Sequence, residues 1–343
     1  MYNVGMYGGS FNPLHIGHVR CIIEAANQCK KLYIVLAVGN NRNEIDKKVR
    51  YRWLYQLTKH IGNVKIIFIE DNANTKEEYT EDLWEEDSIK IKNAIGEKID
   101  AVFCGDDYKN KDSFYTRHYK DSELIFIERD EISSSKIREN VYKYWDYLPN
   151  IVKPYYTKKV LLLGSESTGK STLTINLANY YNTNYIEEAG RELSEKSGTD
   201  LLMLSEDFTE ILLTHKLNEI KAIEHSNKIL FVDTDAIITN FYMHFLEDEN
   251  IIDNERLAKA IIHINKYDAI LFLEPDVDFV QDGDRSEVIK NDRIKYSGKI
   301  KDILNNMNIK YHSISGDYQK RFKKAVSIVD SLLQKNFGAV LDN

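Results

Sequence analysis

The sequence has few cysteines and no long apolar run, and each scarcity excludes a class of protein. Its three cysteines, Cys21, Cys29 and Cys104, are odd in number and lack metal-ligand spacing. Neither a disulfide framework nor a zinc site is therefore expected. No apolar run approaches the roughly 20 residues that a membrane-spanning helix needs. The N-terminus also lacks the basic and apolar regions of a secretory signal, so we expect a cytoplasmic protein that does not bind membranes.

Positively charged residues are fewer than negatively charged ones. The chain has 46 Lys and Arg residues against 54 Asp and Glu residues, for a formal net charge of −8. Surfaces that bind DNA or RNA depend on clustered Lys and Arg side chains that neutralise phosphates. A large nucleic-acid-binding surface is therefore not expected, whereas a local basic pocket for a small nucleotide remains compatible with the composition.

Proline is rare, and its placement predicts a domain boundary. At 343 residues the chain is long enough for two domains of ordinary size. Two of its four prolines, Pro149 and Pro154, lie close together, and proline interrupts the hydrogen bonding of both helices and sheets. We therefore predict one domain over residues 1–150 and a second over residues 157–337.

Both predicted domains begin with a short apolar strand, a glycine-bearing loop and a helix. The two loops are residues 8–15 and 164–169. Further apolar, β-rich runs alternate with helical stretches, at residues 32–38, 65–69, 101–104, 124–127, 229–232 and 269–273. This alternation is typical of mostly parallel sheets and predicts two doubly wound α/β domains. Residues 71–88 are rich in charge and turn formers yet contain Tyr79 and Trp84, and we expect a loop that covers a substrate.

The second loop matches the phosphate-binding pattern G-x-x-x-x-G-K-[ST] at every fixed position and lies between a predicted strand and a predicted helix. Lys170 is expected to bridge the β- and γ-phosphates of ATP, and Ser171 to hold Mg²⁺. The alternative is a glycine-rich turn capped by serine. The other phosphate-binding residues predicted here are Gly164, Ser165, Glu166, Ser167, Thr168, Gly169 and Thr172.

Carboxylates follow a later apolar strand of the same domain. Asp233 and Asp235 come at its carboxyl end, where open α/β sheets place their sites. One is expected to act on Mg²⁺, for which we assign Asp233, and one to accept the proton of a hydroxyl nucleophile. The sequence does not decide which aspartate is the base, and strand ends also carry structural aspartates. Arg285 and Arg293 lie in a polar, glycine-containing segment, typical of a lid whose arginines meet the transferring phosphoryl group, although a solvated helix is the alternative for Arg293.

Two histidines mark the N-terminal domain. His15 and His18 are three residues apart at a predicted helix start, so both are able to face one anion. Such a pair donates to phosphates as negative charge accumulates on departing pyrophosphate. The loop before them adds the predicted phosphate-binding residues Gly8, Gly9, Ser10 and Phe11.

A second phosphate-binding element is predicted near residue 135, where three hydroxyls precede a helix and two cations follow. Serines in this position are often caps alone, so the element gains weight only beside the histidine pair. Its residues are Ser133, Ser134, Ser135, Lys136 and Arg138.

Together these motifs carry a family resemblance. Residues 8–18 and 132–138 resemble the nucleotidylyltransferase superfamily with the HxGH signature. Their fusion to a P-loop, joined by residues 138–140 and 144–149, resembles the bifunctional NadR family of nicotinamide-nucleotide adenylyltransferase and ribosylnicotinamide kinase, over nearly the whole chain. The resemblance implies a Rossmann-like nucleotidylyltransferase domain followed by a P-loop NTPase-type kinase domain.

The resemblance also implies two consecutive reactions of NAD salvage, each using ATP, with Mg²⁺ as the cofactor. The kinase domain would phosphorylate nicotinamide riboside at its 5′-hydroxyl, and the adenylyltransferase domain would join the product, NMN, to AMP, giving NAD and pyrophosphate. It places Trp84, Gly105 and Asp106 near NMN, and Glu188 and Arg191 in the kinase substrate site. Some family members carry an N-terminal helix-turn-helix, but the first predicted strand here begins close to Met1, so DNA binding is not expected; homo-oligomer formation stays open.

Two alternatives remain at this stage. A fusion of pantetheine-phosphate adenylyltransferase with dephospho-coenzyme A kinase has the same two fold types, but residues 144–149 and the Asp-Thr-Asp strand end favour NadR. A nucleotide-sensing regulator with vestigial catalysis would be expected to lack motif residues, and none is missing.

Overall fold

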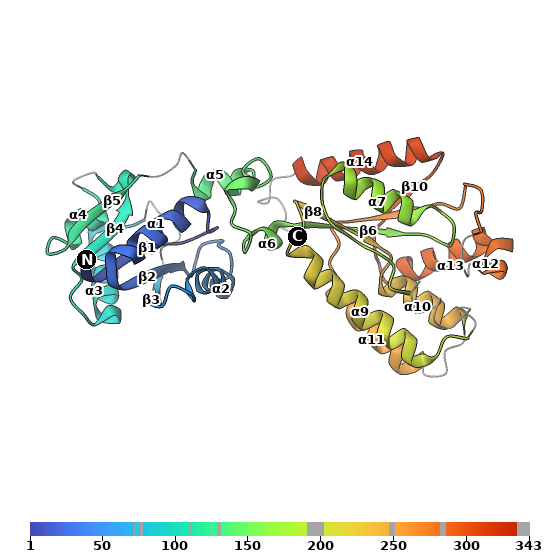
Figure 1. Cartoon of the computed structure of the whole chain (residues 1–343), viewed down its shortest axis with the longest axis horizontal. Helices are drawn as coiled ribbons and strands as arrows, with labels where there is room; N and C mark the ends of the chain where they lie inside the picture. Colours follow the sequence, from blue (N-terminus) through green and yellow to red (C-terminus); the bar gives the residue numbers. More distant parts are fainter. Residues whose placement is uncertain are drawn as a thin grey trace. The chain divides into compact units, whose positions relative to one another are not determined.

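The computed structural model describes residues 1–71, 73, 75, 78–109, 112–128, 132–190, 202–246, 251–281 and 286–334. These residues form two compact units, one over Met1–Val152 and a second that begins at Lys153 (Figure 1). Arg191 and Arg285, for which the sequence predicts roles, lie outside the described residues. In the described part of the chain, no helix has both the length and the apolarity that a membrane crossing requires.

The first unit is built on a parallel sheet with the described strand order β3-β2-β1-β4-β5. Its strands are β1 (Tyr2–Gly9), β2 (Cys29–Gly39), β3 (Val64–Asp71), β4 (Ala101–Gly105) and β5 (Glu123–Ile127). Its α-helices are α1 (Ile16–Gln28), α2 (Lys47–Thr58), α3 (Glu81–Ile95), α4 (Phe114–His118) and α5 (Ser134–Glu139). The chain leaves β1 in one direction to β2 and later returns to β4 on its other side, so the carboxyl end of β1 is a topological switch point.

The second unit repeats this plan with the described strand order β10-β9-β6-β8-β7. Its strands are β6 (Lys158–Leu163), β7 (Tyr185–Ile186), β8 (Ile229–Asp233), β9 (Ala269–Leu273) and β10 (His312–Ile314). Its helices are α6 (Lys153–Tyr156), α7 (Lys170–Tyr180), α9 (Ser205–Ile223), α10 (Ala236–Phe245), α11 (Ile251–Ile264), α12 (Glu287–Asn291), α13 (Arg293–Asn306) and α14 (Tyr318–Gln334). The strand pairings described in both units are parallel, which confirms the predicted fold class.

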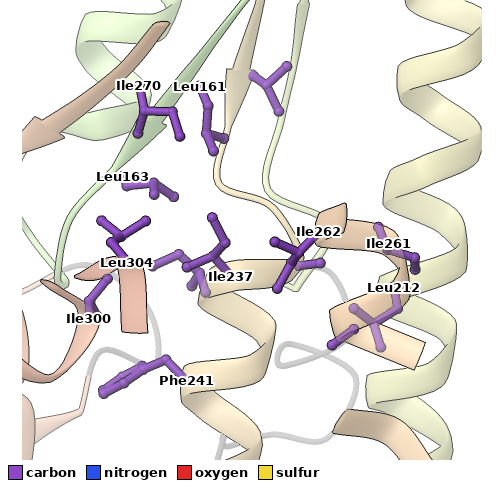
Figure 2. Packing of buried hydrophobic residues seen from close by; sticks show 14 of the residues in the cluster. Leu161, Leu163, Leu212, Ile237, Phe241, Ile261, Ile262, Ile270, Ile300 and Leu304 are labelled. Carbon is purple, nitrogen blue, oxygen red and sulfur yellow. The ribbon is translucent and has the colours of Figure 1, made fainter. Parts of the chain in front are cut away.

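Alternation along β6 explains why the strand is apolar from Val160 to Leu163. Val160 and Leu162 point to one face of the sheet, where they pack with residues of α7 and α14. Leu161 and Leu163 point to the other face and join a cluster from α9, α10, α11 and α13, part of which Figure 2 shows. Because helices cover both faces, neither side of the strand is free to be polar.

Residues 71–88 differ from the loop that the sequence predicts. The hydroxyl of Thr80 accepts a hydrogen bond from the main-chain N–H of Leu83, and Glu81 and Asp82 occupy the first turn of α3. Both features stabilise a helix start. The loop prediction is therefore wrong from residue 81 onward, and Trp84 lies in a helix.

The second unit contains a buried carboxylate that is hydrogen-bonded to two lysines and a tyrosine. Glu219 of α9 is buried, and its carboxylate accepts hydrogen bonds from the Nζ atoms of Lys159 and Lys216, each at 2.9 Å, and from the hydroxyl of Tyr267 at 3.2 Å. Burial alone would raise the pKa of Glu219, but the two lysines hold it below its ordinary value. Glu219 therefore stays charged and fixes α9 against β6.

We expect Glu219→Gln to lower the free energy of unfolding by about 2–3 kcal/mol at pH 7, since it leaves two half-buried ammonium groups without their partner. The pKa of Glu219 is lower in the folded than in the unfolded chain. Its stabilising contribution is therefore present above the unfolded pKa, and is lost as the pH falls through the folded pKa. Urea unfolding followed by circular dichroism at several pH values tests this, with the exposed Glu224→Gln as control. A difference from the unchanged chain that stays constant down to pH 3 would contradict it.

Candidate functional site

The loop after β1 places two histidines together. His15 is the N-cap of α1 and His18 lies one turn later; both are buried. Their rings stack with centroids 3.8 Å apart. Gly17 lies between them, and a Cβ there would come within 3.1 Å of the His15 ring. A side chain at this position would crowd the His15 ring, and the structure places the two predicted histidines in contact with each other.

The second predicted element of this unit packs directly against that loop. Ser134 donates a hydrogen bond to the carbonyl of Pro13 at 2.9 Å, and the guanidinium of Arg138 donates to the carbonyl of Asn12 and to the hydroxyl of Ser135. Segments more than 100 residues apart thus form one site. Ser133 caps α5 through the N–H of Lys136, the simpler role considered for these serines.

The predicted mononucleotide-binding residues come from two elements, the end of β4 and helix α3. Gly105 ends β4, and the pairing of Tyr7 with Phe103 carries Gly105 to the level of Gly9 at the carboxyl edge of the sheet. Asp106 follows it directly. Trp84 instead packs on α4, with Phe114 and His118 at centroid distances of 6.1 and 6.4 Å.

The loop after β6 has the backbone that a phosphate cradle needs. Gly164 and Gly169 have φ angles of +151° and +84°, which disfavour a side chain. The Nζ atom of Lys170 and the hydroxyl of Thr168 donate to the carbonyl of Ser165, at 3.1 and 2.9 Å. The loop is therefore closed on itself, and Ser171 and Thr172 follow in the first turn of α7.

A cavity of about 460 Å³ extends from this loop. One part is lined by the predicted phosphate-binding residues 164–172, and another by apolar residues of α9 and α10 such as Phe208 and Phe241. The predicted residues Glu188 and Asp235 also line it, whereas Asp233 lies buried at the end of β8. A cavity that joins a phosphate loop to an apolar wall suits a substrate with an aromatic base and a phosphate-accepting end.

Asp235 is nearly inaccessible to solvent and caps α10. Its carboxylate accepts a hydrogen bond from the N–H of Ile237 at 2.9 Å. Burial raises the pKa of Asp235 to about 7, although the main-chain bond favours the charged form. A carboxyl group with this pKa exchanges a proton near neutral pH, as a general base must.

The Glu166 carboxylate and the Ser167 carbonyl of the P-loop accept hydrogen bonds from residues later in the chain. Glu166 accepts from the hydroxyl of Tyr242 at 2.7 Å and from the N–H of Ser286 at 2.8 Å. Arg293 donates to the carbonyl of Ser167 at 3.2 Å. Arg293 is therefore neither fully solvated nor separate from the loop, and it holds the main chain that surrounds the phosphate position.

The sequence did not single out two buried arginines that hold the loops. Arg50 of α2 donates to the carbonyl of Ser10 at 2.7 Å, and Arg321 of α14 donates to the carbonyl of Thr168 at 2.6 Å. Each of the two residues is only 1% exposed. Both lie in charge-rich helices, where an inward-facing arginine looks like its exposed neighbours, so no sequence signal distinguished them.

Comparison with known proteins agrees with this geometry. Residues 6–140 match the cytidylyltransferase-like family and residues 159–321 match the AAA domain family. The chain is 30% identical to the trifunctional NAD biosynthesis/regulator protein NadR of Salmonella typhimurium, over 96% of this chain and 83% of that protein. The protein of the same name from Escherichia coli is 28% identical over the same shares.

A solved structure of a NadR protein in complex with NR has a TM-score of 0.78 and 22% identity, covering 97% of this chain and 96% of that one. Similarity at this level of identity shows a shared fold. The sequence similarity to the two curated proteins extends over both units, and the chain therefore belongs to the NadR family of NAD biosynthesis proteins.

Proposed function

We propose that the second unit phosphorylates nicotinamide riboside and that the first unit converts the product to NAD, both at the expense of ATP. The observation that carries this proposal is the presence, in one chain, of a P-loop cavity with an aromatic wall and of a histidine pair packed against a cationic element. The name of the relatives and the NR bound to the structural neighbour support the choice of substrate.

In the kinase reaction, the 5′-hydroxyl oxygen of the riboside attacks the γ-phosphorus of ATP, and the bond to ADP breaks. Lys170 stabilises the charge on the transferring group, and Asp235, which lines the cavity, receives the hydroxyl proton. Ser171 lies in the first turn of α7, which follows the loop after β6, and Asp233 ends the neighbouring strand β8. The hydroxyl of Ser171 and the carboxylate of Asp233 are hard oxygen donors of the kind that Mg²⁺ prefers; they would hold the ion, which would neutralise phosphate charge when bound.

In the adenylyl transfer, a phosphate oxygen of NMN attacks the α-phosphorus of ATP and pyrophosphate leaves. His15 and His18 are placed to donate hydrogen bonds to the phosphates as this charge develops. Arg138 and Lys136 add positive charge beside them. We also propose a cytoplasmic location, where the buried thiols of Cys21, Cys29 and Cys104 would stay reduced.

Two motif variants test whether the units carry separate activities. Lys170→Ala is expected to lower riboside phosphorylation by at least about a hundredfold, because the charge on the γ-phosphate loses its donor, and to leave adenylyl transfer from supplied NMN intact. His18→Ala should do the reverse. Chromatography of products from nicotinamide riboside or NMN with ATP and Mg²⁺ measures both. Loss of both activities in one folded variant would contradict two independent sites. If the unchanged chain phosphorylates dephospho-coenzyme A instead of the riboside, the coenzyme A alternative is favoured.

Arg321→Met is expected to lower kinase kcat/KM by about 10- to 100-fold, since the P-loop main chain loses the donor that orients it. Adenylyl transfer should stay within about twofold, because Arg321 belongs to the other unit. Steady-state kinetics measures both rates, and the exposed Arg256→Met serves as control. An Arg321→Met chain with unchanged kinase kinetics would show that the loop keeps its shape without the arginine.

Arg50→Met should impair the other activity, adenylyl transfer. It removes the donor to the carbonyl of Ser10, and we expect adenylyl transfer to fall by about 10- to 100-fold while riboside phosphorylation persists. The exposed Arg20→Met, on α1 of the same unit, is the matched control. An equal loss of adenylyl transfer in Arg50→Met and Arg20→Met would contradict this role.

A further inference from the structure

His215 is a polar residue on the apolar side of the kinase cavity. It lies on α9 with Phe208 and Ile211, and their spacing places all three on one face of the helix. The same three residues line the cavity, together with the P-loop. Since the P-loop takes the phosphates of ATP, the wall formed by α9 belongs to the part of the cavity left for the phosphoryl acceptor.

The imidazole of His215 is only partly satisfied. The side chain is 5% exposed, and its Nε2 atom is buried without a hydrogen-bond partner among the described residues. The ring forms a hydrogen bond with the main chain of Asp233, which leaves Nε2 as the unused nitrogen. A buried polar atom without a partner costs free energy, and cavities that bind ligands commonly hold such atoms for a ligand group.

The ring is buried beside Phe208 and Ile211 on the apolar wall of the cavity, and such surroundings favour an uncharged imidazole. A neutral imidazole that donates one N–H to a carbonyl has an acceptor at its other nitrogen. The free nitrogen thus calls for a hydrogen-bond donor, which neither ATP phosphate oxygens nor apolar ring edges supply.

We propose that His215 binds the phosphoryl acceptor directly, by accepting a hydrogen bond from a hydroxyl or carboxamide N–H group of the nucleoside. This inference rests on the proposed kinase activity of the second unit. It adds a specificity-determining contact on α9 to the residues that the sequence motifs indicate.

Three substitutions separate this role from packing. His215→Ala and His215→Phe remove the acceptor, and Phe keeps an aromatic ring in its place. Both are expected to raise the KM for nicotinamide riboside by roughly three- to tenfold, the value of one net hydrogen bond, and to leave the KM for ATP unchanged. His215→Gln keeps an acceptor oxygen and should recover part of the loss. The exposed His225→Ala, just beyond the end of α9, is the matched control.

Thermal unfolding and the KM for ATP in the kinase reaction report whether the second unit of each variant is folded. A normal KM for the riboside in His215→Phe would overturn the proposal, because packing alone would then account for the residue. Equal increases in the KM for the riboside and for ATP would also overturn it, since they indicate a general disturbance of the cavity. If the unchanged chain fails to phosphorylate the riboside, the proposed function itself is wrong, and this outcome differs from an active enzyme with unaffected variants.

Nicotinic acid riboside identifies the donor group. Its carboxylate lacks the N–H of the carboxamide. If His215 binds the carboxamide, the preference for nicotinamide riboside over this analogue should fall in His215→Ala. If His215 binds a sugar hydroxyl, both substrates should lose the same factor, and either result supports direct binding of the acceptor.

Discussion

One interaction holds the predicted phosphate-binding loop of each unit: a buried guanidinium donates to a carbonyl of the loop. Arg50 binds the carbonyl of Ser10 and Arg321 that of Thr168. A loop binds phosphate through its main-chain N–H groups, and these face the ligand only when the carbonyl groups face away from it. The arginines fix this orientation, and they remain buried because nearby carboxylates, Glu44 and Asp276, offset their charge.

The same physical plan appears twice in the chain. In each unit the loop follows the central strand of the described sheet, where the chain reverses its direction of winding, and a helix begins directly after it. The units then differ in what faces the phosphate position. The first places stacked histidines there, suited to a departing pyrophosphate, and the second places a lysine and a cavity with an apolar wall. The two chemistries follow from these side chains rather than from the shared fold.

Much of this arrangement was predictable from the sequence because it depends on local patterns. The P-loop spacing, the pair His15 and His18, and the alternation of apolar runs with helices each lie within one short segment. The strands β7 and β10 were not predicted, since two or three residues are too few to show a period. The helix start at Glu81 was missed because charged residues near Thr80 resemble a loop as much as a first helical turn.

The groups that sequence analysis missed share one property, in that their roles depend on contacts between distant segments. Arg321 and Thr168 are 153 residues apart, and Arg50 and Ser10 are 40 apart. The proposed role of His215 depends on the packing of α9 near the end of β8, which places the imidazole at the cavity. Asp233 and Asp235 are separated by a single residue, and only the fold shows that Asp235 lines the cavity while Asp233 ends β8.

The central claim is that one chain carries out both phosphoryl and adenylyl transfer on one substrate. Labelling ATP tests this most directly, by supplying nicotinamide riboside with ATP that carries radioactive phosphorus at either the γ or the α position. We expect NAD to acquire one phosphorus from the γ position, as the phosphate of its nicotinamide half, and one from the α position, in its AMP half. NAD that lacks the γ-derived phosphorus, or that fails to form although labelled mononucleotide accumulates, would contradict it.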